Sequence, residues 1–167
     1  MTPIRLHLAS GKDYREGYIN VDYYAENYEK VDARFDVKSV PYPDNSVDEI
    51  LALHVIEHFD FHEGQRVLEE WYRVLKPGGK LVLETPDFLE TCRAFVIGPE
   101  PVRWGLYNHF FAAPWIPGQI HKFLFTEDQL RVQLGWAKFR QATRITPLSI
   151  YKTDNNHHLL LAMEAIK

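Results

Sequence analysis

The sequence contains very little cysteine and no long apolar run. Cys92 is the single cysteine among 167 residues, which excludes an internal disulfide and a cysteine-based zinc cluster. No stretch of about 18 consecutive apolar residues exists, so we expect no membrane-spanning helix and no membrane partner. The N-terminus also lacks the pattern of a signal peptide, and we predict a cytoplasmic protein.

The chain also has no large excess of positive or negative charge. The chain has 19 basic and 23 acidic residues, a formal net charge of -4, and neither half holds a dense basic patch. Such a patch is typical of nucleic-acid-binding proteins, so we expect no nucleic-acid partner. With 46% hydrophobic and 25% charged residues, the composition is that of an ordinary globular protein. The length predicts one domain over residues 1–167.

A full glycine fingerprint is also missing, although the order of a nucleotide site is present near the N-terminus. Alternating apolar side chains over residues 4–8 predict a buried strand, which the small residues Ala9-Ser10-Gly11 end. A second apolar run, Tyr18–Val21, leads directly to Asp22. Strand, small-residue turn, strand and acid is the order of a Rossmann-like site. Ala9 stands where the first glycine is expected, and the space between the strands is too short for the usual crossover helix.

Strands and helices then alternate along the chain. Helix N-termini are predicted where an acid or threonine precedes Glu or Gln by three residues, at Asp60, Asp87 and Thr126. Apolar runs predict the further strands, at residues 35–37, 47–53 and 81–83, and two closing strands at about 138–145 and 157–165. This order predicts an α/β fold, a Rossmann-like and mostly parallel sheet flanked by helices, with an antiparallel strand pair at the C-terminal end.

Residues 98–125 have a different character. Seven aromatic side chains lie between Trp104 and Phe125, among them Trp115, and prolines and glycines interrupt them. We predict an irregular, aromatic-rich insert, which serves as a lid or binding loop, or as the interface of a homo-oligomer.

Two longer motifs carry a family resemblance. The segments DVKSVPYPDNSVDEILALHVIEHF (residues 36–59) and RVLKPGGKLVLETPD (residues 73–87) resemble the type 11 group of class I S-adenosylmethionine-dependent methyltransferases. LHLASG (6–11) and GYINVD (17–22) are similar to a small bacterial and phage subgroup with a shortened first crossover, and HKFLFTEDQLRVQLGW (121–136) looks like the group's late helix. The resemblance covers about half of the chain, and it implies S-adenosylmethionine as the cofactor.

The resemblance also implies residue roles. The Ala9–Gly11 backbone would face the methionine part of the cofactor, Asp22 would accept both ribose hydroxyls, and Asp36 would bind the adenine amino group. The ring of Tyr23 either lies against the adenine or stays at the surface. The predicted cofactor site consists of Ala9, Ser10, Gly11, Asp22, Tyr23, Asp36, Val37, Leu53, His54 and His58.

Methyl transfer is an in-line displacement, so positioning the acceptor is much of the catalysis, and an acceptor of high pKa also needs a base. Histidine suits that role. Of His54, His58, His109 and His121, we favour His121 and His109 as catalytic residues, because the aromatic insert is expected to meet the acceptor. We expect a small acceptor, methylated on oxygen or nitrogen and bearing a ring or sugar, and no metal.

Two alternatives remain open. His54, Glu57 and His58 spell H-x-x-E-H, the signature of a zinc-dependent hydrolase, provided that the motif lies on one helix. The chain could also be a noncatalytic nucleotide-binding or scaffold protein, which the weakened glycine turn at Ala9 would suit.

Overall fold

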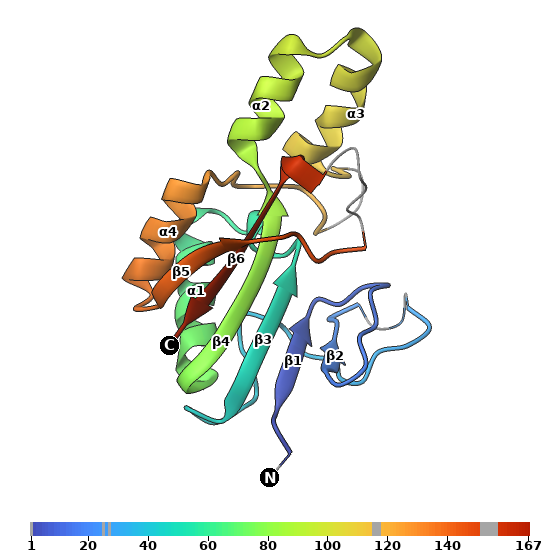
Figure 1. Cartoon of the computed structure of the whole chain (residues 1–167). Coiled ribbons are helices and arrows are strands. Elements are labelled where there is room, and N and C mark those ends of the chain that lie inside the picture. Colours follow the sequence, from blue (N-terminus) through green and yellow to red (C-terminus); the bar gives the residue numbers. More distant parts are fainter. Residues whose placement is uncertain (1, 25, 27, 115–117, 151–156) are drawn as a thin grey trace.

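The computed structural model describes the chain except residues 1, 25, 27, 115–117 and 151–156. Across the described residues, the strands form a single sheet in the order β2-β1-β3-β4-β6-β5 (Figure 1). Their bounds are β1 (Arg5–Leu8), β2 (Ile19–Val21), β3 (Val47–Leu53), β4 (Leu75–Pro86), β5 (Arg140–Ile145) and β6 (Leu160–Ile166). The first four strands in this order are parallel, whereas β6 runs antiparallel to both β4 and β5. The predicted Rossmann-like sheet with its antiparallel C-terminal pair is confirmed.

Side-chain caps mark the beginning of three of the helices. The side chain of Asp60 accepts a hydrogen bond from Glu63 N, and that of Asp87 accepts one from Glu90 N. Thr126 and Gln129 form a reciprocal capping box. The helices are α1 (Phe61–Val74), α2 (Phe88–Ile97), α3 (Glu100–Phe111) and α4 (Glu127–Trp136), with short 3-10 turns at η2 (Ile56–His58) and η3 (His157–Leu159). None of the helices in the described ranges is long and apolar enough to span a bilayer.

The main core lies between one face of the sheet and the helices α1 and α4, which lie side by side in Figure 1. Trp71 of α1 is completely buried there, and its Nε1 donates a hydrogen bond to the carbonyl oxygen of Val37 at 2.9 Å. A smaller cluster on β3 and β4 includes Leu51 and Val82. Helices α2 and α3 extend beyond the carboxyl end of β4 (Figure 1).

Two sequence predictions are wrong. The expected strand at residues 35–37 does not form, because the pairing there is a single bridge between Val21 and Ala33, and Asp36 instead accepts a hydrogen bond from Lys38 N in its own turn. The first part of the segment after residue 98 is also helical and not irregular, since Glu100–Phe111 forms α3. Pro99 and Pro101 lie at the N-terminus of this helix, where the missing N–H has no intrahelical partner to lose. The predicted aromatic residue Trp115 lies outside the described residues.

Candidate functional site

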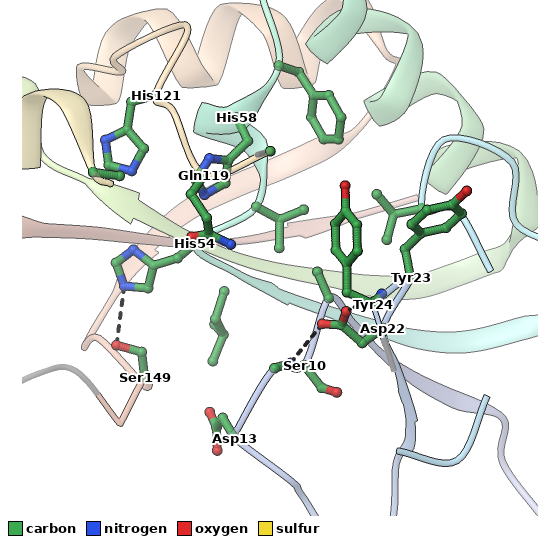
Figure 2. Close-up of a pocket in the computed structure, with 18 of the residues that line it drawn as sticks. Ser10, Asp13, Asp22, Tyr23, Tyr24, His54, His58, Gln119, His121 and Ser149 are labelled. Atoms are coloured by element: carbon green, nitrogen blue, oxygen red, sulfur yellow. Dashed lines mark hydrogen bonds between the residues drawn. The ribbon is translucent and has the colours of Figure 1, made fainter. Parts of the chain in front are cut away.

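The residues predicted for the site converge on one pocket. A cavity of about 880 Å³ opens at the carboxyl ends of the parallel strands, and Figure 2 shows its two ends. Ser10, Asp22, Tyr23 and Tyr24 lie at one end, and His54, His58 and His121 lie at the other. The predicted residues that line the cavity are Ala9, Ser10, Gly11, Asp22, Tyr23, Asp36, Val37, Leu53, His54, His58, His109 and His121. Their proximity is therefore established, whereas the role of each one stays a prediction.

The turn after β1 is held by the acid that follows β2. Gly11 N donates to one carboxylate oxygen of Asp22 at 3.0 Å, and Tyr24 N donates to the other at 2.8 Å. Ala9 and Gly11 both have positive φ, of 51° and 53°. This conformation is unstrained for glycine and strained for alanine. The missing glycine therefore leaves a strained residue at the turn.

Ser10, Asp36 and Tyr23 complete this end of the pocket. Ser10 is buried, and its hydroxyl oxygen has no hydrogen-bond partner among the described residues. An unpaired buried hydroxyl is costly, and a polar ligand in the cavity would satisfy it. Asp36 is half-buried, with its carboxylate 3.6 Å from Lys38 Nζ. Tyr23 is 51% exposed and packs edge-on against Tyr24, so its ring is accessible from the pocket.

His54 is held between two fully buried carboxylates at the other end of the pocket. Its Nδ1 lies 3.2 Å from Oε1 of Glu57, and its Nε2 lies 3.1 Å from Oε1 of Glu84 and 3.3 Å from the hydroxyl of Ser149. Burial by itself lowers the pKa of His54, but the hydrogen bonds and charges of Glu57 and Glu84 outweigh it and raise the pKa to about 9. His54 is therefore a positively charged group at neutral pH.

The ring nitrogens of His58 and His121 have defined roles. Nδ1 of His58 lies 3.1 Å from the carbonyl oxygen of Ile120, and Nδ1 of His121 lies 3.0 Å from that of His109. A carbonyl only accepts, so both Nδ1 atoms carry a hydrogen. In the neutral rings, each Nε2 then holds a lone pair. The two rings are 5.0 Å apart between centroids.

Two histidines of this cluster, His109 and His121, have lowered pKa values, which favours the neutral imidazole. Burial lowers the pKa of His121, against the opposing charge of Glu57, and burial also lowers the pKa of His109. Nδ1 of His109 is buried without a hydrogen-bond partner in the described part of the chain. A neutral, partly buried imidazole is able to accept a proton, so His109 and His121 keep the property that a general base needs.

The geometry contradicts the zinc-hydrolase alternative. His54 follows the last residue of β3 with a φ of 56°, and only residues 56–58 form a 3-10 turn, so the motif does not lie on one helix. Both ring nitrogens of His54 are also engaged by carboxylates. His54 and His58 therefore do not form the paired ligands of that motif.

Sequence reasoning missed two residues of the site. Glu84 is a fully buried acid in β4, and its Oε2 accepts hydrogen bonds from the amides of Leu148 and Ser149 at 2.6 and 3.2 Å. A charged residue at the end of the apolar run Leu81–Leu83 was the available signal. Ser149 carried no comparable signal, because its position depends on a loop that folds back to β4.

Comparisons with known proteins agree with this geometry. Residues 8–83 match the family profile described as a methyltransferase domain. The ubiquinone/menaquinone biosynthesis C-methyltransferase of Geotalea daltonii is 30% identical over 110 residues, which cover 62% of this chain and 45% of that protein. A protein of Mycolicibacterium smegmatis, named as a probable S-adenosylmethionine-dependent methyltransferase, is 36% identical over 78 residues, 46% of this chain and 29% of that protein. The chain thus spans less than half the length of the curated relatives it matches.

Solved structures show the same fold at low sequence identity. An S-adenosylmethionine-dependent methyltransferase of Methanosarcina mazei has a TM-score of 0.65 and 19% identity, with 100% of this chain and 93% of that chain covered. One from Archaeoglobus fulgidus has a TM-score of 0.65 and 16% identity, with 99% and 86% covered.

The sheet order, the turn after β1 and the acid after β2 define a Rossmann-like nucleotide-binding fold. The match of residues 8–83 to the methyltransferase-domain profile and the similar proteins support assigning the chain to the class I S-adenosylmethionine-dependent methyltransferases, with S-adenosylmethionine as the implied cofactor.

Proposed function

We propose that this chain transfers the methyl group of S-adenosylmethionine to an oxygen or nitrogen atom of a small acceptor. The observation that carries the proposal is the continuous cavity of about 880 Å³, which joins the Ala9–Gly11 turn and Asp22 to a cluster of histidines. A cofactor bound at the first end directs its methyl group to an acceptor held at the second.

The residues of the cofactor end suit the cofactor. Each carboxylate oxygen of Asp22 accepts one backbone amide and has a second lone pair for a ribose hydroxyl. The unpaired hydroxyl of Ser10 and the small turn around Gly11 allow a polar ligand to approach the backbone. Asp36 and Tyr23 border the adenine side. S-adenosylmethionine supplies the electrophilic methyl carbon, and these residues orient it.

The histidine end supplies proton chemistry. His54 is positively charged between Glu57 and Glu84, so it positions the surrounding groups and is no base. Burial lowers the pKa values of His109 and His121, which leaves both imidazoles neutral at pH 7 and ready to take an acceptor proton. An O–H or N–H acceptor loses such a proton during transfer, which favours these atoms over the carbon that the name of the Geotalea relative specifies.

Shape and composition support a small acceptor. Asn108, Ala112 and Gln119, from α3 and the segment after it, line the cavity beside the histidines. The aromatic hairpin of α2 and α3 borders this region, which suits a ring-bearing or sugar acceptor. A cytoplasmic setting, free of nucleic-acid partners, is part of the proposal and is supported by the single cysteine and the lack of a basic patch.

A homo-oligomer formed through the hairpin is the further part of the proposal. Ile97 at the end of α2 is 84% exposed and Trp104 of α3 is 68% exposed, with Val96, Tyr107 and Phe111 also exposed. Large apolar side chains gathered on one projecting element favour association, because association removes them from water.

The cofactor site is tested by thermal unfolding with S-adenosylhomocysteine, in the wild type, in Asp22→Asn and in the exposed control Asp128→Asn. Ligand at 100 times its dissociation constant adds about 2.7 kcal/mol to the free energy of unfolding. We expect the unfolding temperature to rise by several degrees in the wild type and the control, and by much less in Asp22→Asn. No rise in the wild type at millimolar ligand would refute the proposal and favour the noncatalytic scaffold.

The base is tested once an acceptor screen has given turnover. His121→Ala and His109→Ala are compared with the wild type for turnover and for S-adenosylhomocysteine affinity. We expect turnover to fall by about 100-fold or more in at least one variant, with affinity for S-adenosylhomocysteine unchanged. Full turnover in both variants would rule out both histidines as the base.

A further inference from the structure

Glu57 is buried behind the pocket, beside the pocket-lining residues His54, His58 and His121, and the proposed function uses only its contact with His54. Its side chain has no exposed surface. One carboxylate oxygen lies 3.2 Å from Nδ1 of His54 and 4.0 Å from Nε2 of His121. The other oxygen, Oε2, has no hydrogen-bond partner within the described ranges. A buried carboxylate oxygen without a donor is unfavourable unless a cation or another donor occupies the space beside it.

The two imidazoles beside Glu57 have the hydrogen-bond pattern of metal-bound histidines. Nδ1 of His58 and Nδ1 of His121 each donate to a backbone carbonyl, at 3.1 and 3.0 Å. In metal sites, this second hydrogen bond fixes the ring and leaves the other nitrogen free to coordinate. Figure 2 shows the His58 and His121 rings at the same end of the pocket, with Gln119 next to them.

Glu57, His58 and His121 come from two segments of the chain that are joined by backbone hydrogen bonds. The carbonyl oxygen of Glu57 accepts hydrogen bonds from Lys122 N at 2.8 Å and from Phe123 N at 3.2 Å. These bonds hold η2 against the chain that carries His121. One ligand atom from each of Glu57, His58 and His121 lies within 4.8 Å of the others. Ligands of a tetrahedral zinc ion are about 3.4 Å apart, so small side-chain rotations complete the site.

We propose that Glu57, His58 and His121 bind a divalent transition-metal ion through one carboxylate oxygen and two Nε2 atoms. Two imidazoles and one carboxylate are a ligand set that suits Zn²⁺, and three protein ligands leave a coordination position open to the pocket. His54 is excluded from the set, because both of its ring nitrogens are held by carboxylates. The proposed site thus takes Glu57 and His58 from the H-x-x-E-H segment and replaces His54 with His121. It differs from the expectation, drawn from the sequence, that no metal is bound.

The open position assigns the ion a place in the reaction, and this role rests on the proposed function. A hydroxyl oxygen of the acceptor coordinated there becomes more acidic. His121 is then a ligand, so His109 accepts the hydroxyl proton. The acceptor oxygen forms a bond to the methyl carbon, the carbon–sulfur bond breaks, and its electron pair returns to sulfur to give S-adenosylhomocysteine.

The site is tested by direct metal binding to the tag-free full chain after dialysis against a chelator. Zn²⁺ and, separately, Mn²⁺ are titrated by calorimetry, and the metal content of the dialysed, reloaded protein is measured by mass spectrometry. The variants are His58→Ala, His121→Ala and Glu57→Gln, and the control is His62→Ala, an exposed histidine on α1 that does not line the pocket. Circular dichroism confirms that each variant is folded.

We expect one Zn²⁺ per chain in the wild type and in His62→Ala, and affinity reduced by more than about 100-fold in each ligand variant. The proposal would be overturned if the wild type did not bind Zn²⁺, or if His58→Ala and His121→Ala bound it as tightly as the wild type does. The S-adenosylhomocysteine measurement is independent of this one. A thermal shift without metal binding leaves the methyltransferase proposal intact, whereas metal binding without a thermal shift leaves only the metal site.

Discussion

Nδ1 of His54 lies 3.2 Å from Oε1 of Glu57, a carboxylate with no exposed surface. The opposite nitrogen of the same ring meets Glu84, which is equally buried. This contact joins the end of β3 to β4 and to the 3-10 turn η2, and the pocket is built around it. Burial of two carboxylates is tolerable because the histidine between them is charged.

The His54 contact makes stability depend on pH. The pKa of His54 rises from 6.5 to about 9 on folding, because the two carboxylates outweigh the effect of burial. A raised pKa means that the contribution is complete below about pH 6.5 and is lost as the pH rises through about 9. The loss is at most about 3 kcal/mol in the free energy of unfolding.

Urea unfolding between pH 6 and pH 10 measures this loss. His54→Gln removes the titrating group, so the fall in stability between pH 6.5 and 9 should be smaller in the variant than in the wild type. Groups that do not contact His54 titrate equally in both proteins and cancel in the difference. The same slope in both proteins would show that His54 is not held as a cation.

Ala9 is the strained position of the cofactor turn. Its φ of 51° costs a non-glycine residue about 1–2 kcal/mol. Glycine removes this strain, but it also increases the conformational entropy of the unfolded chain, which offsets part of the gain in stability. We expect Ala9→Gly to raise the free energy of unfolding by about 0.5–1 kcal/mol. Urea unfolding is the measurement.

Ala52→Gly in β3 is the matched control for Ala9→Gly. Ala52 is buried inside a strand and has no positive φ, so glycine there should lower the free energy of unfolding by about 0.5–1 kcal/mol or more. Destabilisation by both substitutions would mean that packing of the Ala9 methyl group outweighs the strain.

Trp104 tests the proposed contact between copies of the chain. It lies on α3, is 68% exposed and packs against Tyr107 of the same hairpin. We expect the wild type to run as a homo-oligomer in size-exclusion chromatography with light scattering, and Trp104→Ser to shift the population towards the monomer. The matched control is Trp136→Ser, which changes a tryptophan that is 57% exposed on α4. A monomeric wild type, or equal effects of both changes, would contradict the hairpin interface.

Local sequence signals were sufficient for much of the fold. The N-caps at Asp60, Asp87 and Thr126 each depend on a partner three residues away, and the structure confirms all three. The buried strands were also predictable, because an apolar run excludes water wherever the rest of the chain packs. The prediction failed at residues 35–37, where strand formation depends on a partner edge, and at α3, where prolines at the start of a helix were taken for interruptions.

The site divides in the same way. The sequence by itself determined the end of the pocket proposed for the cofactor, because the turn at Ala9–Gly11 and the acid Asp22 follow two short strands that pair in parallel and bring their ends together. Only the tertiary structure decided the histidine end. The pairing of His54 with Glu84 and the meeting of His58 with His121 join segments far apart in the chain, and such contacts follow from how strands and loops pack, which no local pattern of side chains specifies.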